Sequence, residues 1–365
     1  MKYNENWRNS FNNTSNNRRT NNTIYDRYEV DWTVDLQSSV YNQPVVCGNE
    51  LYFSDNVGHV YKIDVREKEI KWKIKVNDEA RNLCIENGSI YIQSNNRVSR
   101  IEASDGSLIW EQEDAPLHCC SPLVIGDTVL WGSKGFDNFV KAYDLATGSV
   151  RWTKEVAGRI DGLTKYKNTI IMQYPCPKTN NSIVEAVESI HGKSIWKFNS
   201  NWGVYRNFHN DIERLLHLSI ACVAHGILYV GSAEGIYQLN PKSGDVINFY
   251  KFNVPIAGAR FGFSICNDHI VYVNDMVLER LNLNNGEIAS VKFDSTLLDP
   301  PIVHYRNTMV VVGGEIQILN TSDWEVKSRL YLQSQSIYSG VAVANDHIYI
   351  GGFNKFYSLL GYTLN

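Results

Sequence analysis

The sequence predicts an all-β protein, an eight-bladed β-propeller of four-stranded blades that is closed by an N-terminal strand completing the last blade. Three observations lead to this prediction. A unit of about forty residues recurs along the chain, each unit holds short apolar runs with period-2 alternation, and an extra copy of the unit's last strand lies near the N-terminus. The unit is clearest at residues 48–72, where a turn at Gly48-Asn49 precedes two apolar runs and then Trp72.

Eight copies of the unit can be counted by the residue that aligns with Tyr52. The equivalents are Tyr91, Leu130, Ile171, Tyr229, Tyr272, Val311 and Tyr349. The eighth unit reaches the C-terminus before a fourth strand can form, and residues 29–34 match residues 69–74, the expected fourth strand of the first unit. We therefore expect the N-terminal strand to complete the eighth blade, because this closure leaves no open sheet edge.

Tryptophans mark the fourth strand of the early units. They are Trp32, Trp72, Trp110, Trp152 and Trp196, and we expect their rings to pack between neighbouring blades. A glycine precedes three of them by four residues, at Gly106, Gly148 and Gly192, which fits a tight turn with positive φ. In units five to seven the aligned positions are Asn248, Ser290 and Ser328. Trp324 lies four residues away from this register and is not counted as a docking tryptophan.

The chain is expected to form one domain preceded by a tail. Residues 1–27 are polar, rich in Asn and without periodicity, so we predict a disordered tail, followed by a single propeller over residues 28–365. The first residues hold no apolar run of signal-peptide length, and no run approaches the roughly 20 residues that cross a bilayer. The seven cysteines are odd in number and form no CxxC pair. We therefore expect a cytoplasmic protein.

The composition and the absence of motifs exclude several function classes. A net charge of −4 argues against a general nucleic-acid binder. No HExxH, GxSxG or GxxxxGK[ST] motif occurs, so zincin, esterase and P-loop chemistry lack their usual signatures. We assign no catalytic residue, and we expect no cofactor, no metal ion, no nucleic-acid partner and no membrane partner.

The pattern from Tyr143-Asp144 through Gly148 to Trp152 resembles the tryptophan-docking repeat of PQQ-like propellers, the family named after the quinoprotein alcohol dehydrogenases. The resemblance covers about residues 28–362 and is strongest in the first four units. It implies the propeller fold but not one function. The family includes periplasmic quinoprotein dehydrogenases, the scaffolding lipoprotein of the outer-membrane barrel-assembly machinery, and repeat domains attached to kinases and other enzymes.

The adjacent cysteines Cys119 and Cys120 precede the expected inner strand of the third unit. Quinoprotein dehydrogenases similarly carry adjacent cysteines before an inner strand, where a ring disulfide faces the cofactor, so the resemblance implies a candidate redox pair. Those enzymes are longer and exported, and they need a calcium site and a catalytic Asp that this sequence does not reveal. We therefore favour two incidental small apolar residues. Four other cysteines fall near inner-strand ends and are interpreted as buried and reduced: Cys47, Cys84, Cys222 and Cys266.

Two insertions fall in the 58-residue step between Ile171 and Tyr229. One covers residues 173–182, and the other covers about residues 199–217 and is predicted to hold a short helix at 211–216. The second contains the candidate partner-binding residues Trp202, Tyr205, Arg206 and His209. Both insertions should emerge on the same face. Loops on a rigid scaffold often bind partners, although a neutral surface insertion is an equally good interpretation.

Arginines from the expected blade-to-blade connections gather on that same face: Arg81, Arg159, Arg206 and Arg260. A cleft lined by one sign of charge concentrates ligands of the opposite sign, so a small anionic ligand in the central channel is a hypothesis. Asp55, Asp161, Asp275 and Asp299 should lie on the same face, where their charges oppose this field.

The sequence favours a non-enzymatic cytoplasmic binding or scaffold propeller. It would recognise a protein or peptide through the rim of blades four and five. Trp and Tyr in the insertion are residue types favoured at binding hot spots, and no complete catalytic constellation is present. The alternatives are a quinoprotein-like cofactor-binding propeller, which rests on Cys119 and Cys120, and a propeller that senses a small anionic ligand.

Overall fold

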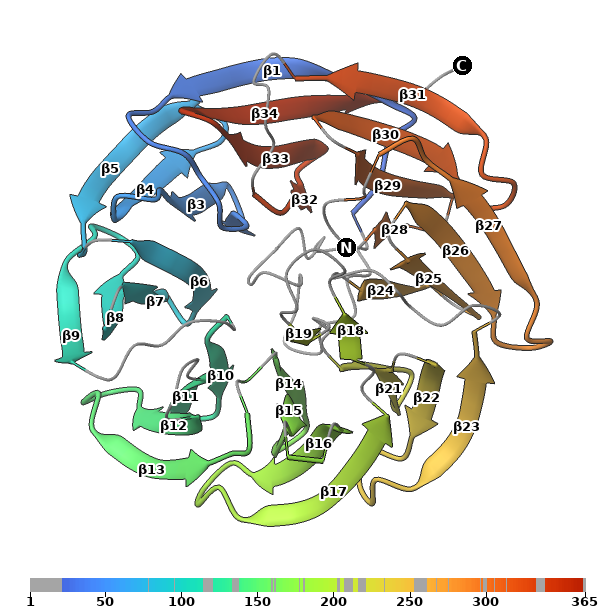
Figure 1. Cartoon of the computed structure of the whole chain (residues 1–365). Helices are drawn as coiled ribbons and strands as arrows, with labels where there is room; N and C mark the ends of the chain where they lie inside the picture. Colours follow the sequence, from blue (N-terminus) through green and yellow to red (C-terminus); the bar gives the residue numbers. More distant parts are fainter. Residues whose placement is uncertain are drawn as a thin grey trace.

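The computed structural model describes most of the chain from Asn22 to Thr363. The described residues are 22–77, 79–94, 96–113, 121–132, 138–158, 160, 162–176, 178–179, 181–201, 204–206, 213–215, 221–232, 234–252, 261–266, 268–274, 276–295, 297, 301–304, 306–312, 314–332 and 339–363. Their regular structure is entirely β-strand, arranged as eight four-stranded antiparallel sheets around a central axis (Figure 1). The predicted eight-bladed propeller is confirmed.

The first four blades follow one another along the chain, each running from its inner strand outward. Blade one consists of β2 (Val45–Cys47), β3 (Glu50–Ser54), β4 (His59–Asp64) and β5 (Glu69–Lys75). Blade two consists of β6 (Ala80–Glu86), β7 (Ser89–Ser94), β8 (Arg97–Glu102) and β9 (Leu108–Glu113). Blade three consists of β10 (Leu123–Ile125), β11 (Thr128–Gly132), β12 (Phe139–Asp144) and β13 (Val150–Glu155). Blade four consists of β14 (Gly162–Tyr166), β15 (Thr169–Cys176), β16 (Asn181–Glu188) and β17 (Ser194–Asn201).

A small hairpin of β18 (Val204–Arg206) and β19 (Glu213–Leu215) separates blade four from blade five. Blade five consists of β20 (Cys222–Ala224), β21 (Ile227–Gly231), β22 (Gly235–Leu239) and β23 (Val246–Lys251). Blade six consists of β24 (Phe261–Cys266), β25 (His269–Asn274), β26 (Val277–Asn282) and β27 (Ile288–Lys292). Blade seven consists of β28 (Ile302–Val303), β29 (Asn307–Val312), β30 (Glu315–Asn320) and β31 (Val326–Tyr331). Blade eight takes β32 (Ala342–Ala344), β33 (His347–Gly352) and β34 (Lys355–Tyr362) from the C-terminus.

The N-terminal strand β1 (Arg27–Asp35) completes blade eight, as predicted. It pairs antiparallel with β34, from Arg27 opposite Tyr362 to Asp35 opposite Lys355, and lies on the outside of the ring (Figure 1). Antiparallel pairing satisfies the backbone groups along the edge of β34 that would otherwise be exposed. The last blade is therefore held by both ends of the chain.

Residues before β1 also contact the propeller, on the side of blade seven. The side chain of Ile24 is 1% exposed, and its carbonyl accepts a hydrogen bond of 2.7 Å from Asn307 Nδ2. The Asp26 carboxylate forms an ion pair of 2.6 Å with Lys327, and its backbone carbonyl accepts a hydrogen bond from the Ser328 hydroxyl. The predicted tail falls mostly on residues 1–21, outside the described part of the chain, so its disorder and the domain division at residue 28 stay predictions.

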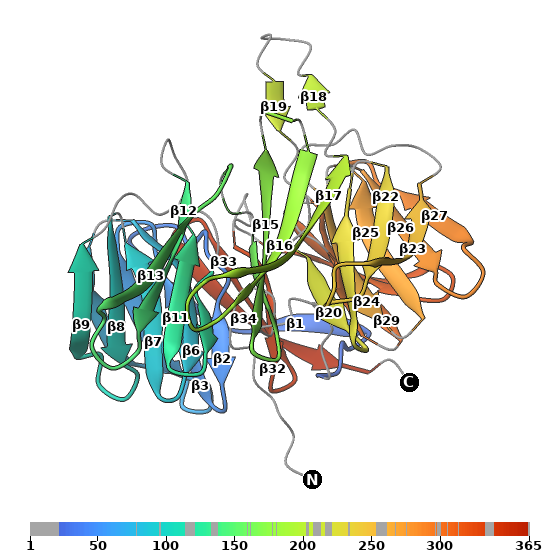
Figure 2. The same cartoon turned by 90° about the horizontal axis from the view of Figure 1, so that it is seen from below.

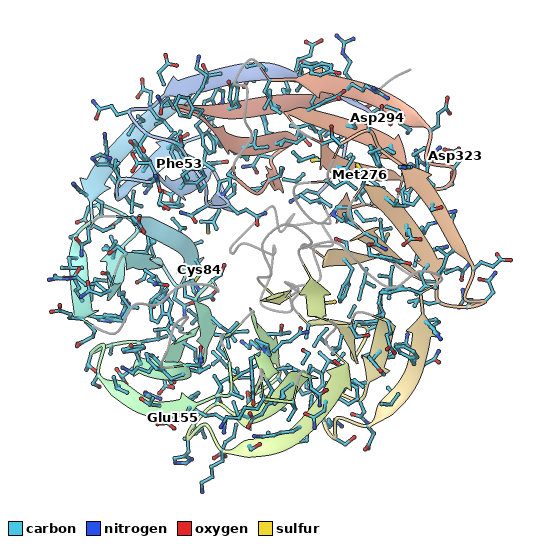
Figure 3. The ribbon with its side chains drawn as sticks, in the orientation of Figure 1. Phe53, Cys84, Glu155, Met276, Asp294 and Asp323 are labelled. Carbon is cyan, nitrogen blue, oxygen red and sulfur yellow. The ribbon has the colours of Figure 1, made fainter. Side chains whose placement is uncertain are left out.

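Apolar side chains fill the spaces between successive blades (Figure 3). Between blades one and two, for example, Val45 and Tyr52 pack in one buried cluster with Leu83 and Ile90. Phe53, labelled in Figure 3, stacks on Phe356 across the junction of blades eight and one, with ring centroids 4.1 Å apart. Burial between neighbouring sheets is the main stabilising contribution, because each blade alone has two apolar faces.

A tryptophan of each early blade docks under the turn of the next blade, at the junctions one–two to four–five. The indole Nε1 groups donate to backbone carbonyls in that turn: Trp72 to Ala103 at 3.3 Å, Trp110 to Leu145 at 2.9 Å, Trp152 to Ser189 at 3.0 Å and Trp196 to Pro241 at 3.2 Å. The same turns bring a glycine onto the indole face, with positive φ at Gly106, Gly148, Gly192 and Gly244. The predicted role of these tryptophans is confirmed.

Trp32, the tryptophan of the closing strand, packs differently. Its ring is tilted against Tyr349 of the same blade, with ring centroids 6.4 Å apart. Its indole nitrogen is buried and has no hydrogen-bond acceptor among the described residues. At the turn of blade one, Lys68 with a φ of 59° stands where later blades have glycine.

At two later junctions that lack the docking tryptophan, other side chains donate to the turn carbonyl, as Arg100 does to Leu145 beside Trp110 in blade two. Between blades five and six, the Tyr250 hydroxyl donates to the Leu283 carbonyl at 2.8 Å. Between blades six and seven, a guanidinium nitrogen of Arg280 donates to the Thr321 carbonyl. Both carbonyls occupy the turn position that the indole contacts in the early blades. The junctions thus keep the hydrogen bond when the indole is lost.

Trp324 lies at the turn position that glycine occupies in the early blades. Its backbone N–H donates to Asn320 O at 3.0 Å, its φ is 67°, and its ring is 8% exposed. The ring belongs to the buried cluster between blades six and seven, and the Arg280 guanidinium lies 5.4 Å from its centroid. Blade six has Ser290 instead of a tryptophan, so the large ring at this junction comes from the following blade. The sequence register did not reveal this exchange.

We predict that Gly148→Ala destabilises the fold much more than Gly126→Ala. Both glycines have positive φ, so each alanine variant pays a backbone cost of about 1–2 kcal/mol. A Cβ at Gly148 would also lie 2.7 Å from the Trp110 ring, whereas nothing lies within 4 Å of a Cβ at Gly126. The resulting overlap adds about 1–3 kcal/mol. Urea unfolding of the two variants measures the difference, and equal losses would show that the indole–glycine contact is not tight.

We also predict opposite outcomes for two N-terminal truncations. A chain that begins at Asn22 keeps every described contact of the segment before β1 and should melt at the wild-type temperature. A chain that begins at Leu36 loses all of β1, the buried Tyr28 and the contacts of Ile24 and Asp26. Its stability should fall by more than about 5 kcal/mol, because a whole strand and large buried side chains are removed. Thermal melting and size-exclusion chromatography report both results. Equal melting temperatures would contradict closure by β1.

Candidate functional site

Most of the predicted site residues lie where the structure gives no description. Trp202, His209, Arg159, Arg260, Cys119 and Cys120 lie outside the described residues. For Arg81 in β6 and for Tyr205 and Arg206 in β18, the backbone alone is described. The predicted arginine cluster in the central channel and the candidate redox pair therefore stay predictions.

The second insertion contains a β-hairpin. Val204 pairs with Leu215, Tyr205 with Arg214 and Arg206 with Glu213, in an antiparallel register. The helix predicted at residues 211–216 is wrong, because Glu213–Leu215 form the strand β19. A helix of six residues is marginal in water without tertiary cover. In the hairpin, oppositely charged residues lie at paired positions on the two strands, which favours the pairing.

The hairpin rises above one face of the ring, which we call the hairpin face (Figure 2). In the view along the axis, β18 and β19 lie inside the circle of blades (Figure 1). The two strands form a sheet of their own and pair with no other described strand. We call the opposite side the turn face, because the turns between the third and fourth strands emerge there. The hairpin is thus an element added to the propeller, placed over its central opening.

Blade four provides an elongated base for the hairpin. The strands β15, β16 and β17 have eight residues each, and they project beyond the neighbouring blades on the hairpin face (Figure 2). The first insertion, predicted as residues 173–182, supplies most of this length. Tyr174 pairs with Ile183, Cys176 with Asn181, and Asn181 in turn with Asn201. The inserted residues continue the ladder on both sides, so much of the predicted loop is strand.

Both ends of the second insertion are attached to this base. At its start, Asn201 is paired with Asn181 in the sheet. At its end, the backbone N–H of Ala221 donates to Gln173 Oε1 at 2.9 Å, and the amide nitrogen of Gln173 lies 3.4 Å from the Ser182 hydroxyl. The Gln173 side chain is buried, which makes these bonds costly to break. The hairpin therefore stands on fixed points.

A buried carboxylate stabilises the elongated sheet. Glu185 is 0% exposed, accepts a hydrogen bond from the Tyr174 hydroxyl, and forms ion pairs with Lys154 at 3.1 Å and Lys197 at 3.4 Å. Burial raises the pKa of Glu185, but hydrogen bonds from Tyr174, Ser194 and Lys154 outweigh this effect, so its pKa lies below the ordinary glutamate value. Burial and the bond to Glu185 raise the pKa of the Tyr174 hydroxyl. Both groups are engaged in structure and offer no reactive proton.

The described residues do not provide the calcium site expected of a quinoprotein dehydrogenase. Within the described ranges, no group of three or more His, Cys, Asp or Glu side chains is placed to hold a metal ion. Apart from Cys176 in blade four, the described cysteines lie on inner strands: Cys47, Cys84, Cys222 and Cys266. Burial raises the pKa of the Cys84 and Cys222 thiols. Cys84, Cys222 and Cys266 are buried, as the sequence predicts, whereas Cys47 is only half-buried.

None of the described elements is a helix long and apolar enough to cross a membrane.

The sequence matches one protein-family model, described as outer membrane protein assembly factor BamB, over residues 9–168. This range covers the first three blades, where the docking tryptophans are regular. Among curated proteins, no sequence matches the chain.

Solved structures with the same fold belong to proteins of different function. BamB from Moraxella catarrhalis superposes with a TM-score of 0.72 at 14% sequence identity, covering 92% of this chain and 100% of that chain. The quinohemoprotein alcohol dehydrogenase ADHIIG from Pseudomonas putida HK5 gives a TM-score of 0.76 at 11% identity, covering 99% of this chain and 81% of that chain. A europium-containing methanol dehydrogenase gives 0.75 at 15% identity, covering 96% and 91%.

At these identities the structural similarity establishes the fold and leaves the function open. The repeat in the sequence, the ring of eight blades and the match to the family model over residues 9–168 are consistent with a PQQ-like (quinoprotein alcohol dehydrogenase-like) β-propeller.

Proposed function

We propose that this protein is a non-enzymatic scaffold that binds a protein or peptide through the rim of blades four and five. The observation that carries the proposal is the β18–β19 hairpin, which stands on the elongated strands of blade four and over the central opening (Figure 2). The family model that matches the chain is described as an assembly factor, and BamB is among the proteins of similar fold. A scaffold role is consistent with both.

The hairpin suits recognition by its construction. A two-stranded hairpin leaves one edge of each strand without a partner, and unpaired edges accept an added strand from another chain. Trp202, Tyr205, Arg206 and His209 in and beside it are residue types that carry binding energy at protein interfaces. Its base is held by Gln173 and by the pairing of Asn181 with Asn201. Little conformational freedom is therefore left for the base to lose on binding.

A quinoprotein-like cofactor-binding role is the alternative. Its support is the fold shared with the two dehydrogenases and the adjacent Cys119 and Cys120 in the sequence. The described residues supply no metal-binding cluster for it, so we derive no catalytic step.

We further propose that the protein works in the cytoplasm. Among the described residues, Cys47, Cys84, Cys176 and Cys222 are thiols outside any disulfide, as is usual where thiols are kept reduced. Fractionation of cells that express the full chain tests this, and recovery from an oxidising compartment would contradict it.

The binding proposal predicts that two changes in the insertion abolish capture of a partner. One variant replaces residues 203–217 with a short Gly-Ser linker and keeps Asn201 and Ala221, the two fixed points. The other is the double substitution Tyr205→Ala and Arg206→Ala. Each should weaken binding of a captured and then purified partner by about tenfold or more, because hot-spot truncations cost 2 kcal/mol or more. Affinity capture from native cells, followed by a titration with the purified partner, gives the measurement.

The matched control changes the same residue types elsewhere. Tyr331 and Arg329 lie on the outer strand of blade seven, where the Tyr331 side chain is 72% exposed. Arg329→Ala with Tyr331→Ala should leave binding unchanged. All variants should melt near the wild-type temperature. A partner that binds the linker variant as tightly as the wild type would refute the rim as the binding surface.

A further inference from the structure

The junction of blades six and seven contains two cavities of about 420 Å³ each. It is also the junction where Ser290 takes the place of the docking tryptophan and Trp324 supplies the ring from the following blade. One cavity opens toward the hairpin face, beside Tyr331, and the other opens toward the turn face, beside Thr321. The second, which we call the turn-face cavity, differs from the first in its charge.

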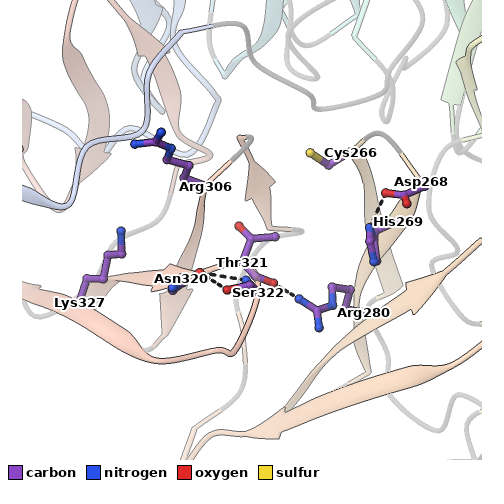
Figure 4. A pocket seen from close by; sticks show the side chains of 9 residues that line it. All are labelled: Cys266, Asp268, His269, Arg280, Arg306, Asn320, Thr321, Ser322 and Lys327. Atoms are coloured by element: carbon purple, nitrogen blue, oxygen red, sulfur yellow. Dashed lines mark hydrogen bonds and ion pairs between the residues drawn. The ribbon is translucent and has the colours of Figure 1, made fainter.

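Cationic side chains line the turn-face cavity from both blades. Figure 4 shows Arg306 and Lys327 of blade seven on one side and His269 and Arg280 of blade six on the other, with Thr321 and Ser322 between them. Asp268 is the one carboxylate among the lining residues, against three permanent cations. The cavity therefore has a positive formal charge.

The acids near the cavity already have partners. Asp268 contacts His269 Nδ1 at 2.7 Å and accepts a hydrogen bond from Asn284 at 2.9 Å. Behind the wall, Asp26 forms its ion pair with Lys327. These contacts hold His269 and Lys327 in position, and the Asp26 carboxylate offsets part of the charge of Lys327. Few carboxylate oxygens near the cavity therefore remain to pair with Arg280 and Arg306.

Arg280 and Arg306 differ in how many of their guanidinium N–H groups are already hydrogen-bonded. One guanidinium nitrogen of Arg280 is fixed to the Thr321 carbonyl, and its plane lies near the Trp324 ring, which leaves other N–H donors of this group unused. Arg306 is exposed, and its guanidinium has no hydrogen bond or ion pair to any described residue. A held cation and an unpaired one thus face each other across the cavity.

We propose that the turn-face cavity binds a metabolite-sized molecule with oxyanion groups, carboxylate or phosphate. Arginine presents a planar fork of donors that matches the geometry of both groups. The volume of about 420 Å³ falls within the range of small-molecule sites. A molecule with two such groups would use both sides, one at Arg306 and Lys327 and one at Arg280 and His269. This site is on the face opposite to the hairpin and is separate from the proposed partner surface.

Isothermal titration calorimetry of the full chain at low salt tests the proposal. The probes are inorganic phosphate, citrate and fructose 1,6-bisphosphate, with glucose as the uncharged control. We expect saturable binding of at least one anionic probe, weakened by added NaCl because exposed charges are screened. Tighter binding of citrate than of the two phosphate probes would identify a carboxylate ligand, and the reverse order would identify a phosphate ligand.

Arg306→Ala is the decisive variant, because the side chain has no described partner to lose in the fold. It should weaken binding by about tenfold or more, and Arg306→Lys should weaken it less. Arg66→Ala is the matched control, since Arg66 is an exposed arginine on the turn face, in the turn between the third and fourth strands of blade one. No saturable binding of any anionic probe at about 10 mM, well above ordinary metabolite affinities, would overturn the proposal. Equal affinities in Arg306→Ala and Arg66→Ala would overturn it as well.

Discussion

Each tryptophan of the first four blades holds the following blade in two ways. Its ring lies against a glycine of the next turn, and its indole N–H donates to a carbonyl of that turn. The ring contact excludes any Cβ at that glycine, and the hydrogen bond fixes the height of one blade relative to the next. Because neighbouring blades share no backbone hydrogen bonds between their sheets, side-chain contacts of this kind set their relative placement. The regular half of the ring follows from one contact repeated four times.

At two junctions of the other half, the turn carbonyl keeps a side-chain hydrogen bond although the preceding blade supplies no docking tryptophan. Tyr250 and Arg280 reach the same turn carbonyls that the indoles reach earlier in the chain. At the junction of blades six and seven the ring comes from Trp324 of the following blade, and two cavities lie there. The candidate ligand site, the turn-face cavity, thus lies at a junction that lacks the regular tryptophan packing. A cavity lowers the stability of the fold, and a ligand that binds in it raises that stability again.

The sequence predicts the architecture well because the repeat pattern recurs in every blade. Eight repeat units and the match of residues 29–34 to residues 69–74 are sufficient to place β1 on β34. The position of Trp324 was not predicted. The alignment compared residues of the fourth strands, whereas Trp324 lies in the turn before the fourth strand of blade seven. The helix at residues 211–216 was wrong, since no repeat constrains an insertion and local propensity is a weak guide over six residues. The turn-face cavity draws Arg280, Arg306 and Lys327 from three separate strands or turns, and no short motif links them.

The composite blade has a consequence for the order in which the protein is made. The strand Arg27–Asp35 leaves the ribosome before the other described strands, and its partner Lys355–Tyr362 follows after them. At 5–20 residues per second, the roughly 320 residues between them take about 15–65 s to synthesise. Seven blades can form during that interval while the first strand waits with its backbone groups unpaired. A chain released early would keep every internal blade and still expose an unpaired edge, and such an edge is a template for aggregation. Completion of the ring therefore distinguishes a chain that extends through Tyr362 from one that is interrupted before β34.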